Sequence, residues 1–164
     1  MKTEIDRAQG KELLYRDLAA QLAALLEGET DALANLSNAS ALLFQALERI
    51  NWCGFYLMRK GELVLGPFQG KPACIRIPLG KGVCGTAAMR RQTLVVPDVE
   101  KFPGHIACDA ASRSEIVVPI VEGSRLLGVL DMDAPEPARF DAADQKGLES
   151  FVVALVPRVA WDRL

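Results

Sequence analysis

The stretch EIVVPIVEGSRLLGVLDMD, residues 115–133, decides the fold. It predicts two strands, 115–121 and 126–133, because β-branched and other apolar residues dominate both runs. The segment 122–125 between them contains a glycine and predicts the short turn of a hairpin. Strands joined in this way pair antiparallel, so we expect the second half of the chain to build an antiparallel sheet.

The segments upstream of this hairpin predict further strands and one short helix. Apolar runs bounded by turn residues predict strands at 52–58, 62–65, 75–77 and 94–96. We expect proline-containing turns at 66–74, and a glycine-rich loop at 80–85 that leads into a short helix at 86–91. A long loop, 98–114, follows, and loops of this length in a small domain are more often functional than incidental.

Helices are predicted at both ends of the chain. Thr30 or Asp31 can cap a second helix, and Asp141 can cap a final one. The order of elements predicts an α+β fold in which terminal helices cover a sheet. The first helix ends near Gly28 and is predicted by leucines at three- and four-residue spacing: Leu13, Leu14, Leu18, Leu22, Leu25 and Leu26.

The composition is that of a soluble globular protein. At 164 residues the chain suits a single domain, 1–164, and 50% of its residues are apolar. Its formal net charge is −2 and no stripe of Lys and Arg appears, which argues against nucleic-acid binding. The charged opening, residues 1–6, predicts no secretory signal, and no uncharged stretch is long enough to cross a membrane. We therefore expect a cytoplasmic protein.

Four cysteines, Cys53, Cys74, Cys84 and Cys108, pose the first functional question. In a reducing cytosol they are expected to be buried thiols, metal ligands or redox-active groups rather than structural disulfides. Cys53 lies in a predicted core strand, which favours a packing role. A metal site built from His105 and the other three cysteines is disfavoured, because the closely spaced ligand pairs of structural zinc sites are absent.

Cys108 lies in the long loop, where the backbone can wrap around a ligand. A thiol attacks an electrophile only as the thiolate, so Cys108 needs access and a favourable local field. Arg113, His105 and Lys101 are close in sequence and could supply positive charge, whereas Asp109 would oppose it. The alternative, a buried and inert Cys108, is equally compatible with the sequence.

Three acidic residues fall close together in the predicted sheet. Asp131 and Asp133 are two residues apart on one strand and share a face, and Glu115 opens the neighbouring strand. If the three meet, mutual repulsion raises the proton affinity of at least one of them. That group could donate a proton while an ionised neighbour binds an ammonium group. The alternative is an ordinary solvated strand face.

Trp52 and Tyr56 are four residues apart on one predicted strand and also share a face. Aromatic residues at this spacing are more often part of a core than of a binding site. Their alternative role is an apolar wall for a small methyl or thioether group.

Several segments carry a more specific pattern. The supporting motifs are GHIACD (104–109), SRSEIVVP (112–119), NWCGFY (51–56), LGPFQG (65–70), GKGVCG (80–85) and GVLDMD (128–133). In these motifs the chain resembles the GAF-domain family of free methionine-R-sulfoxide reductases, over residues 15–155. The resemblance implies a six-stranded antiparallel GAF sheet flanked by N-terminal and C-terminal helices, usually in a homodimer.

The resemblance also implies a role for three of the cysteines. Cys108 would attack the sulfoxide of free L-methionine-R-sulfoxide and become a sulfenic acid. Cys74 or Cys84 would then form an intramolecular disulfide with it, and an external thiol such as thioredoxin would reduce that disulfide. Which of the two cysteines resolves the intermediate is left open.

The same resemblance implies a substrate site without a metal or a bound cofactor. Glu115, Asp131 and Asp133 would bind the substrate, and one of them would donate the proton. Trp52 and Tyr56 would line the methyl side. The identity of the proton donor does not follow from the sequence.

Two other functions compete with this one. A non-catalytic GAF sensor would bind a ligand such as a cyclic nucleotide or a tetrapyrrole, but the chain has neither an Asn-Lys-x-x-Phe pattern nor an adjacent Cys-His pair. A peroxidase-like thiol module would react with hydrogen peroxide instead of a sulfoxide.

Overall fold

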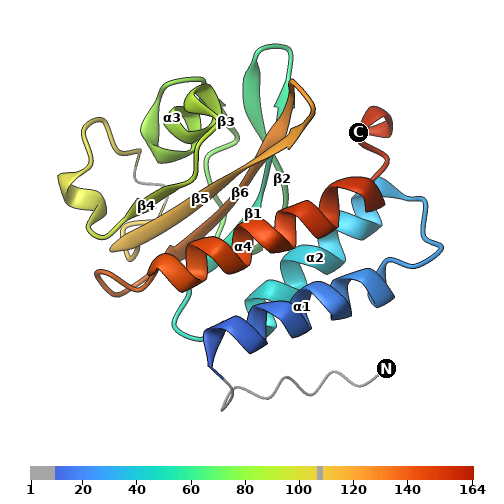
Figure 1. Ribbon diagram of the computed structural model, residues 1–164. Coiled ribbons are helices and arrows are strands. Elements are labelled where there is room, and N and C mark those ends of the chain that lie inside the picture. Colours follow the sequence, from blue (N-terminus) through green and yellow to red (C-terminus); the bar gives the residue numbers. More distant parts are fainter. Residues whose placement is uncertain (1–9, 107–108) are drawn as a thin grey trace.

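The computed structural model of the chain describes residues 10–106 and 109–164 (Figure 1). Within these residues, six strands form one antiparallel sheet in the order β3-β2-β1-β6-β5-β4. The predicted α+β class and the antiparallel GAF-type sheet are therefore confirmed. The strands are β1 (Trp52–Arg59), β2 (Glu62–Gly70), β3 (Arg76–Pro78), β4 (Leu94–Val96), β5 (Ser114–Glu122) and β6 (Arg125–Ala134).

Helices cover both faces of the sheet. Three of them, α1, α2 and α4, lie together on one face, whereas α3 lies against the other (Figure 1). In the described ranges, no helix combines the length and the apolar character that a membrane crossing requires. The α-helices of this part of the chain are α1 (Lys11–Leu25), α2 (Ala32–Ala46), α3 (Gly82–Arg90) and α4 (Ala142–Leu155), and short 3-10 helices lie at Val99–Lys101, Val156–Arg158 and Trp161–Arg163.

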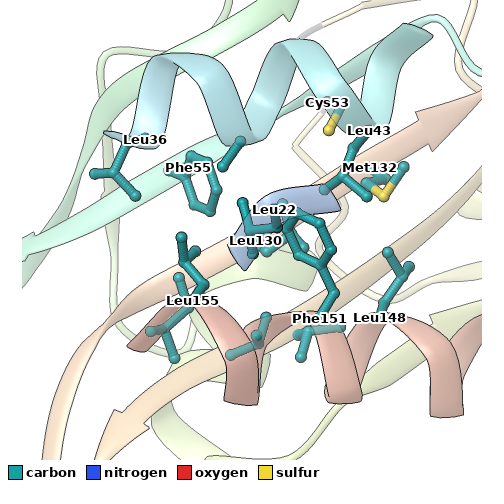
Figure 2. Packing of buried hydrophobic residues seen from close by; sticks show 14 of the residues in the cluster. Leu22, Leu36, Leu43, Cys53, Phe55, Leu130, Met132, Leu148, Phe151 and Leu155 are labelled. Atoms are coloured by element: carbon teal, nitrogen blue, oxygen red, sulfur yellow. The ribbon is translucent and has the colours of Figure 1, made fainter. Parts of the chain in front are cut away.

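The alternation of side chains along the central strands divides the apolar residues into two clusters. Phe55 and Leu130 point to the larger cluster, where Phe151 of α4 packs against them (Figure 2). Cys53 is fully buried in the same cluster beside Met132, which confirms its predicted packing role. The smaller cluster lies under α3. The larger part of the core therefore lies on one face of the sheet, and the other face is available for a site.

The predicted helix caps are confirmed at the second and the last helix. Asp31, rather than Thr30, caps α2 by accepting a hydrogen bond from the backbone of Ala34 at 2.8 Å. Asp141 caps α4, and Asp144 completes a capping box with it. Both α2 and α4 therefore begin at a side chain that satisfies otherwise unpaired backbone N–H groups.

Two predicted boundaries are wrong, and each error has a physical reason. Residues 66–70 continue β2 instead of turning, because the strand accommodates Pro67 where its register with β1 shifts between Gly54 and Tyr56. Helix α3 begins at Gly82, not at 86, although glycine is a poor helix former. A Cβ on Gly85 would lie 2.3 Å from the carbonyl oxygen of Pro78, so a glycine here lets α3 pack closely on β3.

Asp144 holds together a buried network between the two ends of the chain. Its carboxylate accepts hydrogen bonds from Tyr15 at 2.8 Å, from Lys11 at 2.6 Å and from Arg139 at 3.3 Å. Asp144 is 1% exposed and Arg139 is 8% exposed. Because both charges are buried, the loss of one leaves the other without compensation.

We therefore expect Asp144→Ala to lower the free energy of unfolding by about 3–5 kcal/mol, since Arg139 would remain buried and unpaired. Urea denaturation followed by circular dichroism measures the change. Asp162→Ala is the matched control, because its ion pair with Arg125 lies on the surface and should contribute less than about 1 kcal/mol. Equal losses in the two variants would contradict the role of the network.

Candidate active site

The sheet face covered by α3, called the site face below, carries the three predicted acids. Glu115 on β5 lies opposite Asp133 on β6, and Asp133 lies opposite Trp52 on β1. Asp131 lies two residues before Asp133 on the same face. Glu115 is 5% exposed and Asp131 is 6% exposed, and Asp133 is partly exposed. The alternative of an ordinary solvated strand face is therefore wrong.

An aromatic wall stands beside the acids. The ring of Trp52 stacks on Tyr56 with 5.8 Å between centroids, and on Phe68 of β2 with 5.3 Å. Gly54 makes this stacking possible, because a Cβ there would lie 2.7 Å from the Trp52 ring and 2.3 Å from the Cβ of Phe68. Trp52 and Tyr56 share a face, as predicted. Phe68 was missed because its segment was expected to turn.

The polar atoms of the aromatic wall hold the connection between β2 and β3. The indole nitrogen of Trp52 donates to the carbonyl oxygen of Lys71 at 3.1 Å. The hydroxyl of Tyr56 donates to the carbonyl oxygen of Cys74 at 3.0 Å. The aromatic wall thereby positions the backbone of the connection that carries Cys74.

Helix α3 and the loop before β5 close the site from above. The thiol of Cys84 on α3 donates a hydrogen bond to Oε1 of Glu115, with Sγ and Oε1 3.9 Å apart. Nε2 of His105 lies 3.7 Å from Oε2 of the same carboxyl group. His105 and Ile106 line the resulting pocket together with Cys84, the three acids and the two predicted aromatics.

Asn51 ties the loop to the start of β1. Its side-chain nitrogen donates to Asp109 at 3.2 Å and to the hydroxyl of Ser112 at 3.1 Å. Asp109 and Ser112 both line the pocket. Sequence reasoning missed Asn51 and Ser112, although both lie in the motifs 51–56 and 112–119, which is the signal that could have drawn attention to them.

The cationic residues predicted to assist Cys108 do not share one location. His105 lines the pocket. Lys101 is exposed and pairs with Asp98 at 3.3 Å, and Arg113 lies 3.9 Å from Glu100, so neither lines the pocket. Cys108 itself lies outside the described residues. Its place in the site therefore stays a prediction.

Burial disfavours the ionised forms of the three acids in the pocket. Burial, followed by the charges of Asp131 and Asp133, raises the pKa of Glu115 well above its ordinary value. Burial and the charge of Asp131 likewise raise the pKa of Asp133. Asp131 has the lowest pKa of the three, about 6, because hydrogen bonds from Cys84 and Glu115 partly offset its burial. Burial and mutual repulsion accordingly favour the protonated forms of Glu115 and Asp133 beside Asp131.

The described cysteines occupy three different environments. Cys74 is half-buried and disulfide-bonded, whereas Cys53 and Cys84 are free thiols. Burial and the charges of Asp131 and Glu115 raise the pKa of Cys84 well above that of a free thiol. Cys84 is therefore a protonated hydrogen-bond donor at neutral pH and a poor nucleophile.

A metal ion would find three possible ligands here. Ligand atoms of Cys84, Glu115 and Asp131 lie within 4.8 Å of one another, and all three residues are buried. One thiol and two carboxyl groups fall short of the four protein ligands that close a structural zinc site. The raised pKa values of these residues favour their protonated forms over the deprotonated forms that a metal ion would require.

A GAF-domain family model matches residues 34–155 of the chain. The free methionine-R-sulfoxide reductase of Escherichia coli is 55% identical over 141 residues, which are 86% of each chain. The chain belongs to the GAF family of free methionine-R-sulfoxide reductases. Within this family, the substrate complex of the Staphylococcus aureus enzyme has a TM-score of 0.85 at 55% identity and covers 89% of this chain and 95% of its own. The Neisseria meningitidis reductase, also solved with its substrate, has a TM-score of 0.89 at 45% identity, with coverages of 94% and 93%.

The raised pKa values of the acid cluster predict that it contributes less to the stability of the protein as the pH rises. An acid whose pKa is raised by folding holds its proton longer in the folded state, so stability is present at low pH and is lost as pH rises. Glu115→Gln removes one such group. We compare the free energy of unfolding of Glu115→Gln with that of the unsubstituted protein at each pH. The difference should favour the variant by about 1–2 kcal/mol more at pH 8 than at pH 5.

Urea denaturation at the two pH values measures this difference. Glu27→Gln is the control, because Glu27 is exposed and its substitution should leave the pH dependence unchanged. A Glu115→Gln effect that is the same at both pH values would show that Glu115 has an ordinary pKa.

Proposed function

We propose that this protein reduces free L-methionine-R-sulfoxide to L-methionine through a cysteine sulfenic acid at Cys108. The observation that carries the proposal is a buried pocket in which three acids face an aromatic wall, in a chain 55% identical to a named reductase of this activity. Such a pocket offers a charge for an ammonium group, protons for an oxygen and an apolar surface for a methyl group.

Substrate recognition follows from the charges of the pocket. Asp131, the most acidic member of the cluster, binds the substrate ammonium, because its Oδ1 is buried and has no hydrogen-bond partner among the described residues. A buried carboxylate oxygen without a partner is costly, and an ammonium group removes that cost. The methyl group lies against Trp52 and Tyr56. A peptide-bound methionine sulfoxide lacks the free ammonium and does not fit an enclosed site.

The chemical step transfers the sulfoxide oxygen to the enzyme. The Cys108 thiolate attacks the sulfur of the protonated sulfoxide and forms a sulfur–sulfur bond. That bond and the sulfur–oxygen bond of the substrate then break as the oxygen bonds to the Cys108 sulfur, which becomes a sulfenic acid. The thioether product takes the electron pair, and one proton is consumed. Glu115 or Asp133 supplies that proton, since the pKa values of both are raised.

We assign the resolving role to Cys74 and a different role to Cys84. The disulfide at Cys74 supports this assignment, as does the free state of Cys84. The Cys74 thiol displaces hydroxide from the Cys108 sulfenic acid, which forms a disulfide and releases water. Cys84 instead donates a hydrogen bond to Glu115 and keeps the acid cluster in order.

The catalytic cycle closes when an external dithiol, thioredoxin in this proposal, reduces the disulfide. No metal or resident cofactor takes part. We further propose a single domain over 1–164, a cytoplasmic location and a homodimer. The free thiols Cys53 and Cys84 suit a reducing compartment.

The substrate is tested by incubating the reduced protein with each epimer of free methionine sulfoxide. We expect methionine from the R epimer only, because the S epimer misplaces the oxygen or the methyl group relative to the acids and Trp52. Cys108→Ser should form none. Chromatography of the free methionine measures the yield. Turnover by Cys108→Ser would refute the thiol mechanism, and a thiol loss with hydrogen peroxide that exceeds the loss with the sulfoxide would favour the peroxidase function.

The two candidate resolving cysteines are separated by their serine variants. Cys74→Ser should still form one methionine per protein, but its thioredoxin-dependent turnover should fall by about tenfold or more, because the sulfenic acid cannot become a disulfide. Cys84→Ser should retain turnover, since a serine hydroxyl also donates to Glu115. Single-turnover yield and steady-state rate measure the two effects. The reverse result would make Cys84 the resolving cysteine.

A further inference from the structure

The surface around Cys74 is more basic than the rest of the chain. Residues 63–97 contain no acid, although the whole chain has a net charge of −2. Two of the basic residues there are paired, Arg76 with Glu62 and Lys71 with Asp109. The stretch carries five basic residues, Lys71, Arg76, Lys81, Arg90 and Arg91.

Large apolar side chains are exposed on the same surface. Ile75 is 70% exposed, Met89 58%, and Leu79 and Ile106 37% each. They account for more than half of the exposed large hydrophobic residues of the described chain, which also include Leu13, Leu33 and Val153. Such clustering is typical of a protein interaction site, whereas single exposed apolar residues are ordinary.

These apolar residues surround one part of the fold. Ile75 follows Cys74 directly and lies immediately before β3, whose central residue Ile77 is buried under α3. A Cβ on Gly80, next to Leu79, would lie 3.1 Å from the sulfur of Met89. A Cβ on Gly82 would lie 3.2 Å from Ile106. The exposed apolar residues therefore gather around α3 and Cys74, across the sheet from α4 (Figure 1).

We propose that this surface, Ile75, Leu79, Met89 and Ile106 with Lys81 and Arg90 beside them, is the docking site for an acidic dithiol protein of the thioredoxin class. The inference rests on the proposed function. A thiolate of the partner must reach a sulfur of the Cys74 disulfide, so the partner has to cover Ile75. The basic residues of this surface complement an acidic partner and favour a rapid encounter.

The two thiols of the partner supply both electrons for the disulfide exchange that this docking permits. The first thiolate forms a mixed disulfide and releases one sulfur of this protein as a thiolate. The second thiol of the partner then attacks the mixed disulfide and releases the partner in its oxidised form. Two electrons and two protons pass to this protein.

The test compares thioredoxin with dithiothreitol as the reductant. Ile75→Asp removes an apolar contact and adds a charge of the same sign as the partner's. We expect it to lower kcat/KM for thioredoxin by about tenfold, with turnover in dithiothreitol unchanged. Val153→Asp is the matched control, because Val153 is 74% exposed but lies on α4, on the opposite face.

A charge reversal tests the electrostatic part of the proposal. Lys81→Glu places an acid at the start of α3, where the helix dipole favours it, so the fold should tolerate the change. We expect kcat/KM for thioredoxin to rise at low salt in the unsubstituted protein, and that rise to be smaller in Lys81→Glu. Lys146→Glu on α4 is the control and should keep the full salt dependence.

Equal losses in Ile75→Asp and Val153→Asp, or no loss in either, would overturn the docking site. A salt dependence that is the same in Lys81→Glu and the unsubstituted protein would overturn its electrostatic part. A wrong proposed function would give a different result, because the protein would then form no methionine with dithiothreitol as the reductant. Docking is still measured in that case, by counting the thiols that thioredoxin releases from the oxidised protein.

Discussion

The crowding of three carboxyl groups on the site face of β6 and β5 is the constraint on which the site depends. Asp131, Asp133 and Glu115 line one pocket and are largely shielded from water, and burial raises the pKa of all three. The pocket therefore favours protonated carboxyl groups beside Asp131 before a substrate binds. That combination suits a small zwitterion from which an oxygen must be removed.

Such a cluster is costly, and the division of the sheet into two faces offsets the cost. Along β1 and β6, successive side chains alternate between the large apolar cluster and the site. Met132, for example, lies in the core between two acids that point to the opposite face. The helices α1, α2 and α4 pack on the core face only, so stability there does not require the site face to be apolar.

The thiols illustrate how position on this sheet determines chemistry. Cys53 faces the core and is inert, whereas Cys84 faces the acids and holds its proton. Cys74 lies at the edge of the smaller apolar cluster. It belongs to the connection between β2 and β3, which accepts hydrogen bonds from Trp52 and Tyr56. The residues proposed to recognise the methyl group thus also position the disulfide-bonded cysteine. In the proposed mechanism, two side chains therefore link substrate binding to the redox chemistry.

The sequence by itself predicted the α+β class, the β5–β6 hairpin and the helix caps at Asp31 and Asp141, because these depend on local periodicity and on hydrogen bonds between near neighbours. It also predicted that Asp131 and Asp133 share a face, since alternation along a strand is a local property. Their burial was not predictable, because it depends on α3, which packs over the sheet from another part of the chain.

The tertiary structure alone decided the partners of each site residue. Phe68 joins the aromatic wall because a register shift lets β2 continue past Pro67, and glycine at position 54 leaves room for the Cβ of Phe68 and for the ring of Trp52. Cys84 meets Glu115 because α3 begins earlier than helix propensity predicts. Spacing along the chain fixes which residues share a face, whereas contacts between distant elements fix which charges are buried together, and those charges set the chemistry.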